Sequence, residues 1–204
     1  MKSLPWLGIA RAWVLGARRA QQSQQALDAV EKNVENAPDS PDKQRLKGYI
    51  AAARAYTFDI QGNKSTTIAY ARQANELLPA DEVAVRSLNL TIWGDVLNID
   101  HYDPASMPLL EEALALGLQA KKPHVAMIAA MALASAHLNA GRLHEVQHVF
   151  QRMSAIAEEY QSRTQRPLSA MAGIYSLMGR TFAEWGEHEK AVHFTRKGVL
   201  LSER

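Results

Sequence analysis

A short stretch of the chain, HEVQH at residues 144–148, has the composition and spacing of a zinc-protease motif. In such enzymes two histidines four residues apart on a helix bind Zn²⁺, and the glutamate between them serves as the general base. A catalytic zinc site also needs a third ligand and a metal-bound water in a cleft. Position 151 is glutamine, so the extended motif is absent, and Glu184 would be a third ligand from a distant segment with no motif to support it.

The helical periodicity around this stretch favours another interpretation. The apolar residues spaced for one helix face are Val146, Phe150, Met153 and Ala157. At about 100° per residue, His144 and His148 lie roughly 160° from that stripe on either side, which turns them toward solvent. We therefore predict a chance motif, with no metal site, no cofactor and no enzymatic activity, and a zinc hydrolase as the remote alternative.

Other candidate chemical signals are weaker. GNKST at residues 62–66 shares letters with a phosphate-binding loop but lacks its leading glycine and its Gly-Lys-Ser/Thr order, so a turn and a helix cap are predicted. His137 lies on an inward face and is predicted to be a hydrogen-bonded core residue. The chain has no cysteine, so neither a thiolate nor a disulfide is available. No Ser-His-Asp or Gly-x-Ser-x-Gly arrangement is present.

The charge distribution argues against nucleic-acid binding. The 204 residues carry a net charge of +2, but residues 1–75 hold 11 basic and 6 acidic groups, whereas residues 76–140 hold 3 and 8. An acidic middle would repel phosphates, and no arginine-rich stripe compensates for it. We predict that this chain does not bind nucleic acid directly.

The hydropathy pattern argues against a membrane protein. The most apolar stretch, residues 125–138, is too short to span a bilayer, and the N-terminal apolar run is interrupted by Arg11, which is unlike a secretory signal. We predict no membrane association and a cytoplasmic location.

An internal repeat of about forty residues organises the chain. Gly62, Gly141 and Gly186 each lie between two helical patterns, at intervals of 79 and 45 residues. A unit centred near His101, which replaces the glycine, fills the longer interval, and one more unit precedes Gly62. The spacing is that of the tetratricopeptide pattern, with small residues where helices approach closely: Ala55, Gly94, Ala134 and Gly179. One helix pair cannot bury its apolar face alone, so stacked pairs build the core.

We therefore predict an all-α fold, a tetratricopeptide-like superhelix (α-α solenoid) of about five antiparallel helix pairs. Residues 1–204 are expected to form a single repeat domain. Its units are predicted at about 4–38, 42–79, 83–121, 124–161 and 167–204.

The same repeated residues carry a resemblance to a known family. The relevant segments are WLGIARAWVL, AYTFDIQGNKSTTIAYARQANELLPADEVAVRSLNL, WGDVL, AGRLHEV and GRTFAEWGEHEKA. They resemble the helical repeat region of large LuxR-type, MalT-like bacterial transcription regulators. In those proteins an ATPase precedes the repeats and a helix-turn-helix follows them, and this chain shows neither a Walker loop nor a recognisable helix-turn-helix. The resemblance implies a module that senses an inducer or an inhibitory protein.

A ligand is expected on the concave face, which the first helix of each pair lines. Arg11 and Arg18 occupy this row in the first unit. In the later units the candidate groove residues are Tyr49, Tyr56, Asp59, Thr91, Asp95, Asn98, Met131, Ser135, Asn139, Ser176, Arg180 and Glu184. Their mixture of aromatic, polar and charged side chains is typical of recognition sites. We predict that the groove binds a small-molecule effector or a protein segment.

A general protein-interaction scaffold, unrelated to transcription, is the main alternative to a sensor module. The last unit ends with an apolar face that includes Val192, Val199 and Leu200, and this face is predicted to pair with a second copy in a homodimer through the terminal repeats.

Overall fold

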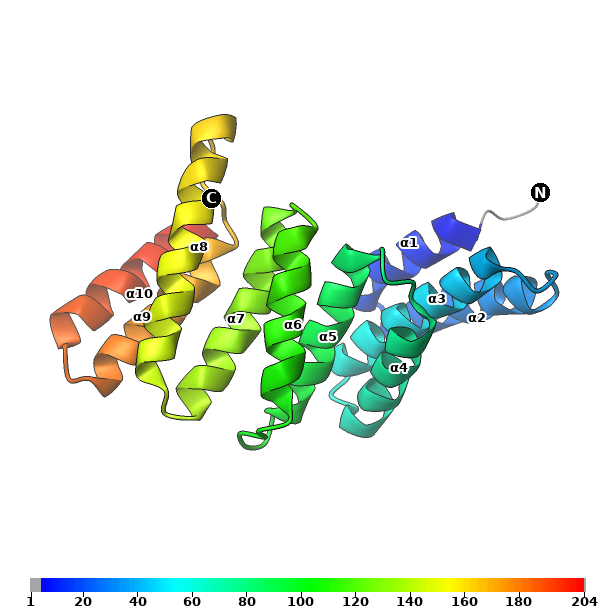
Figure 1. The fold of residues 1–204 in the computed structure, drawn as a ribbon, viewed down its shortest axis with the longest axis horizontal. Coiled ribbons are helices and arrows are strands. Elements are labelled where there is room, and N and C mark those ends of the chain that lie inside the picture. The colour runs from blue at the N-terminus through cyan, green and yellow to red at the C-terminus, as the bar shows by residue number, and fades with distance from the viewer. Residues whose placement is uncertain (1–4, 204) are drawn as a thin grey trace.

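The computed structural model describes residues 5–203. Within that range the chain forms ten α-helices and no strand. The helices follow one another as antiparallel pairs along the long axis of the molecule (Figure 1). Their bounds are α1 (Pro5–Gly16), α2 (Ala20–Glu35), α3 (Pro41–Ile60), α4 (Lys64–Leu77), α5 (Val83–Leu97), α6 (Ser106–Gln119), α7 (Pro123–Asn139), α8 (Leu143–Thr164), α9 (Met171–Glu184) and α10 (His188–Ser202). This arrangement confirms the predicted α-α solenoid of five pairs.

Three of the turns within pairs depend on glycine. Gly62, Gly141 and Gly186 have φ values of +70°, +71° and +75°, a region that other residues enter only at a steric cost. At each turn the amide after the glycine donates to a carbonyl five residues earlier: Asn63 to Phe58 (3.0 Å), Arg142 to His137 (2.8 Å) and Glu187 to Phe182 (2.9 Å). These bonds satisfy carbonyls at the helix end, so each glycine closes its first helix and reverses the chain.

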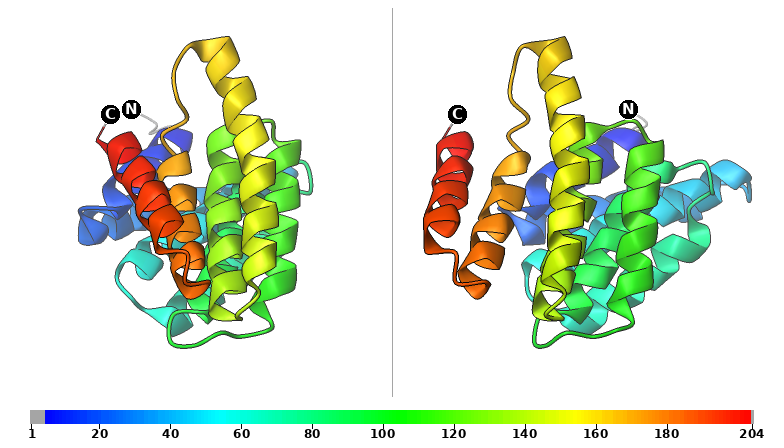
Figure 2. Two further views of the ribbon diagram at one scale, coloured as in Figure 1. Left: turned by 90° about the vertical axis from the view of Figure 1, so that its left-hand side faces the viewer. Right: turned by 60° about the vertical axis from the view of Figure 1, so that its left-hand side comes forward.

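The helices form an inner and an outer row. The first helices of the pairs, α1, α3, α5, α7 and α9, contact one another in order. Among the described residues the backbones of the second helices approach first helices but not one another, and side chains join α8 to α10, where the rings of Phe150 and Phe194 lie 5.4 Å apart. Successive pairs are rotated about the long axis rather than stacked in a plane, as the turned views show (Figure 2). The first helices therefore form a continuous inner row, whereas the backbones of α6 and α8 on the outer side stay apart.

Close approach of the two helices in a pair requires small residues at the predicted positions. A Cβ on Gly94 would lie 2.6 Å from Cγ of Leu110, and one on Gly179 would lie 3.1 Å from the carbonyl oxygen of Ala191. Both distances are below normal van der Waals contact. The repeat pattern thus correctly identifies where α5 meets α6 and where α9 meets α10.

The third pair replaces the glycine turn with a longer loop. Asn98 organises this loop, since its side-chain oxygen accepts bonds from the amide of Asp103 (3.0 Å) and the hydroxyl of Ser106 (3.2 Å). Its side-chain amide donates to the carbonyl of Gly94 at 3.0 Å. The side chain of Asn98 therefore acts as a cap between α5 and α6.

The apolar core is distributed unevenly. The C-terminal three pairs share one large cluster around Leu110, Met127, Met153 and Met178. The N-terminal two pairs hold two smaller clusters, one around Leu27 and Ile50 and another built largely of alanine.

Ion pairs show the opposite distribution. In the N-terminal half most of them join separate elements: Arg54 of α3 contacts Asp28 and Glu31 of α2, both at 2.7 Å, and Lys64 of α4 contacts Asp100, in the loop after α5, at 3.0 Å. The pair of Lys43 with Asp39 is local. The pairs found beyond residue 140 of the described chain are local, three or four residues apart on one helix or at its start. Ion pairs between separate elements therefore occur in the first three helix pairs, where Arg86 of α5 also contacts Glu112 of α6 at 3.8 Å, and are replaced by local pairs beyond residue 140 of the described chain. No helix of the described chain is both long and apolar enough to cross a bilayer.

Candidate functional site in the inner groove

One cavity of about 380 Å³ lies on the inner row, where α5, α7 and α9 come together. Six of the predicted groove residues line it: Thr91, Asp95, Met131, Ser135, Ser176 and Arg180. They come from three different repeats, so only the stacked fold brings them together. The volume lies within the range of small-molecule binding pockets.

The lining of this cavity is amphipathic. Ile128, Met131 and Leu177 supply an apolar surface, and Ile128 and Met131 remain 43% and 37% exposed, which is high for large apolar side chains. The hydroxyl of Ser135 forms no hydrogen bond within the described chain, and the hydroxyl of Ser176 donates only to the carbonyl of Ala172 in its own helix, at 3.1 Å. The cavity thus offers apolar contact together with hydroxyl groups that can bond to a ligand.

Charged groups lie at the cavity wall without intramolecular partners. Asp95 on α5 and Arg180 on α9 both line the cavity, and neither forms an ion pair within the described chain. Burial raises the pKa of the Asp95 carboxyl, because desolvation disfavours its charged form. Asp59 of α3 behaves similarly: burial, with the charge of Asp95 adding to it, raises its pKa to about 6. A partly buried carboxyl with a raised pKa beside a cavity, as at Asp95, is a common feature of binding sites.

The N-terminal part of the predicted row is occupied by contacts within the protein. Tyr49 packs edge-on against Trp6, with ring centroids 5.0 Å apart, and its hydroxyl donates to Glu82. Tyr56 stacks on Trp13 at 5.1 Å. Both tyrosines therefore join α3 to α1 as part of the stack. Desolvation, followed by the Glu82 contact, raises the pKa of Tyr49 to about 12, so its hydroxyl stays protonated.

Three other predicted groove residues do not line the cavity. Asn98 is engaged in capping the loop after α5. Asn139 and Glu184 are exposed at the C-terminal ends of α7 and α9. These three residues were predicted from their positions within the repeat. Their side chains lie at helix ends, away from the place where α5, α7 and α9 meet.

Comparison with known proteins identifies the family. The sequence model described as the MalT-like TPR region matches residues 48–204, most of the chain. The protein belongs to the MalT-like TPR region family. No curated protein and no solved structure matches the chain. The resemblance inferred from the repeated segments is thereby confirmed.

In this MalT-like TPR region the HEVQH stretch lies on the outer surface of α8. His144 packs against Trp185 with ring centroids 5.3 Å apart, and Nδ1 of His148 lies 3.5 Å from a carboxylate oxygen of Glu145. Both histidines are exposed. Among the described residues no group of three potential ligands is placed to hold a metal ion. The motif thus consists of a surface ring contact and a local ion pair on one helix.

His137 differs from its prediction in one respect. It is buried at the end of α7, but its Nδ1 has no hydrogen-bond partner. Burial lowers the pKa of His137, and the nearby Arg142 lowers it further, so the ring is neutral at pH 7. The prediction of a buried histidine is confirmed, but the prediction of a hydrogen bond is wrong for this nitrogen.

The GNKST stretch forms the predicted turn and cap. Gly62 takes the left-handed conformation, and the side chain of Asn63 accepts a bond from the amide of Thr66 at 3.2 Å. The letters that suggested a phosphate loop are those of the α3–α4 turn.

Sequence reasoning missed four residues that complete the cavity: Ile128, Ala132, Gly173 and Leu177. A usable signal was present, since Ile128, Met131 and Ser135 recur at helical spacing on α7, as Gly173, Ser176 and Arg180 approximately do on α9. Extending each predicted position by one turn of helix would have found them.

Proposed function

We propose that this MalT-like TPR region is a non-enzymatic sensor module that binds a small effector in the cavity formed by α5, α7 and α9. The observation that carries the proposal is the convergence of six groove residues from three repeats on that cavity. An apolar wall, hydroxyl groups and unpaired charges together favour a polar ligand with an apolar part.

The wider role follows from the family. The name of the matched family and the resemblance to LuxR-type regulators support a part in transcription regulation in the cytoplasm. In this proposal the module senses the effector and does not itself contact nucleic acid. The alternative, a general scaffold that binds a protein segment along the whole groove, has less support because Tyr49 and Tyr56 are already engaged with α1.

A second part of the proposal concerns self-association. Val192, Val199 and Leu200 on α10 are half or more exposed, although α10 packs on α9 and its Phe194 meets Phe150 of α8 with ring centroids 5.4 Å apart. A second copy could cover this face and form a homodimer through the terminal repeats. Light scattering of the purified chain tests this point: a mass of two chains supports it, and a monomer over the full concentration range contradicts it.

The sensor function is tested by a thermal-shift screen of sugars, nucleotides and amino acids, with hits titrated by calorimetry. Arg180→Gln and Asp95→Asn each remove one charge from the cavity wall and should weaken binding by about tenfold or more. Arg152→Gln on α8 is the matched control, since Arg152 is exposed and is not among the residues that line the inner cavity. A hit whose affinity is unchanged in both cavity variants would show that the effector binds elsewhere.

A further inference from the structure

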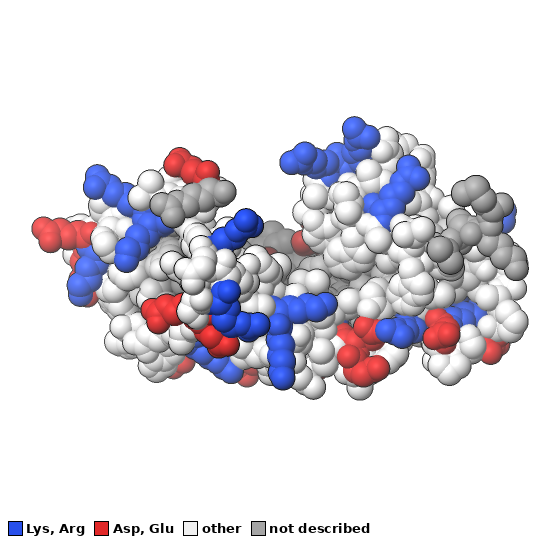
Figure 3. Space-filling view, turned by 90° about the horizontal axis from the view of Figure 1, so that it is seen from above, with Lys and Arg blue, Asp and Glu red and all other residues white. Residues whose placement is uncertain are grey.

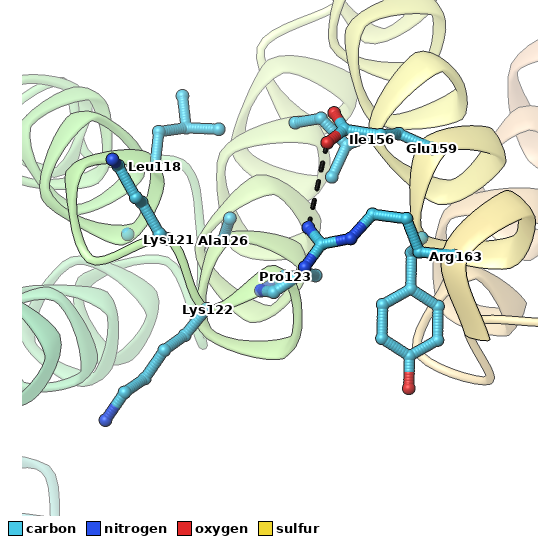
Figure 4. A pocket seen from close by; sticks show the side chains of 10 residues that line it. Leu118, Lys121, Lys122, Pro123, Ala126, Ile156, Glu159 and Arg163 are labelled. Carbon is cyan, nitrogen blue, oxygen red and sulfur yellow. Dashed lines mark ion pairs between the residues drawn. The ribbon is translucent and has the colours of Figure 1, made fainter.

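A second cavity, on the outer side of the molecule, is not explained by the sensor function. It has a volume of about 420 Å³ and lies between α6 and α8, over the first turn of α7 (Figure 4). The second helices α6 and α8 do not contact each other. The start of α7 and the turn before it form the floor of this gap. The cavity is therefore separate from the inner groove, although α7 contributes to both.

The rim of the outer cavity is basic. Lys121 and Lys122 come from the turn between α6 and α7, and Arg163 comes from the last turns of α8. The one carboxylate in the lining is Glu159, whose contact with Arg163 is long, at 3.8 Å, and exposed to water. Neither lysine has an ion-pair partner within the described chain. Lys and Arg side chains gather near the middle of the molecule when it is viewed from above (Figure 3).

The charge at the start of α7 is opposite in sign to that at the start of α5, in the preceding repeat. The residue before α3 is Ser40, whose hydroxyl caps the helix by accepting from the amide of Lys43 at 3.1 Å. The residue before α5 is Glu82, a carboxylate paired with Arg45. The residue before α7 is Lys122, which supplies no cap, and the first turn of α7 contains no acidic residue. The positive end of a helix favours an anion, which this chain supplies at α5 but not at α7.

The inner part of the outer cavity is apolar. Leu118 of α6, Ala126 of α7 and Ile156 of α8 line it, together with the ring of Tyr160. Figure 4 shows Arg163 reaching across from α8 toward Pro123, while the two lysine side chains spread to the opposite side. A ligand in this position would meet cations at its rim and apolar side chains beneath them.

We propose that the outer cavity is a binding site for an organic anion, a phosphate, sulfonate or carboxylate attached to an aromatic or aliphatic body. The anionic group pairs with Arg163 and the two lysines. The body lies against Ile156, Leu118 and Tyr160. The site requires both parts of the ligand, because exposed cations alone bind inorganic anions weakly in salt.

The experiment titrates the full chain by calorimetry with phenyl phosphate, naphthalene-1-sulfonate and indole-3-acetate. Inorganic phosphate and phenol serve as the separate halves of such a ligand. At least one aromatic anion should bind about tenfold or more tightly than phosphate or phenol. The double variant Lys122→Gln/Arg163→Gln should lose that binding, whereas Arg152→Gln on the same helix should keep it. Amide NMR shifts on binding should concentrate at Gly117, Lys122 and Ala126, which places the ligand in this cavity.

Three results would overturn the proposal. None of the three aromatic anions binds saturably; or binding survives in the folded double variant; or phosphate alone binds as tightly as the aromatic anions. Circular dichroism of each variant distinguishes loss of the site from loss of the fold. The inner cavity contains none of the substituted residues, so failure here leaves the sensor function standing.

Discussion

The two ends of the inner row differ in what their side chains do. At the N-terminal end Tyr49 and Tyr56 pack on tryptophans of α1, and ion pairs such as Arg54 with Asp28 join neighbouring helices. At the C-terminal end Met131, Ser135 and Arg180 have no such partners and line a cavity. One repeat pattern thus serves assembly at one end and, in our account, recognition at the other.

The core beneath each end explains why this division is possible. The C-terminal pairs rest on a single large apolar cluster, so their inner side chains are not needed to hold the stack together. The N-terminal pairs have smaller clusters rich in alanine and rely on polar and aromatic contacts between helices. Binding residues are best held by a rigid support, and the C-terminal end supplies it.

The largest expected effect is in the C-terminal core. Met153 is fully buried in the large cluster, and Met153→Ala should lower the free energy of unfolding by about 3 kcal/mol, because it removes apolar contact and leaves a void. Met131→Ala, at an exposed position on the inner row, should cost less than about 1 kcal/mol. Urea unfolding measures both, and equal losses would contradict the contrast between core and groove.

A somewhat smaller effect is expected from the N-terminal ion pairs. Arg54 is 8% exposed, contacts Asp28 and Glu31, and lies over the ring of Tyr70. Arg54→Met keeps the aliphatic stem but leaves two carboxylates unpaired, which should cost about 2 kcal/mol. The loss should be smaller in 1 M NaCl, because salt already screens the pair in the wild type. Urea unfolding at low salt and in 1 M NaCl measures this dependence. If the stability loss of Met153→Ala depended on salt as strongly as that of Arg54→Met, the contrast between an apolar C-terminal end and a polar N-terminal end would be contradicted.

The boundary between the two ends contains a carboxyl that should destabilise the fold. The pKa of Asp59 is raised to about 6 by burial and by Asp95, so the folded protein holds this proton more tightly than the unfolded chain. The contribution of Asp59 to the free energy of unfolding is therefore most favourable below about pH 4, and it becomes less favourable as the pH rises from about 4 to 6. Because the site is partly hydrated, Asp59→Asn should raise stability at pH 7.5 by only about 1 kcal/mol, and by almost nothing near pH 4. Denaturation at the two pH values measures this difference, and equal effects at both would indicate an ordinary Asp59 pKa.

Much of this architecture could be predicted from the sequence, for a physical reason. Glycine is nearly obligatory at a positive φ, and only small residues fit where two helices touch, so Gly62, Gly94 and Gly179 mark turns and contacts by themselves. The pairing of helices and the identity of the inner row follow from that spacing. These features depend on the backbone and recur in each repeat.

The contacts that each inner side chain makes could not be predicted in the same way. The repeat position indicates that Tyr56 faces inward, but only the neighbouring pair shows that Trp13 meets it there. Asn98 became a loop cap because its repeat lacks the glycine turn. The outer cavity depends on the gap between α6 and α8. This gap arises from how the helices pack, and no repeating pattern in the sequence predicts it.

The most direct test of recognition at the inner cavity is calorimetric titration of the effector found by the screen into wild type and Gly173→Ala. A Cβ at Gly173 would lie 1.9 Å from the sulfur of Met131, so that flexible side chain must move within the cavity. Stability should change little, because the helix propensity gained by alanine offsets the displaced methionine. The account predicts a loss of affinity of about tenfold or more with the fold intact. Unchanged affinity in Gly173→Ala would contradict recognition at this cavity.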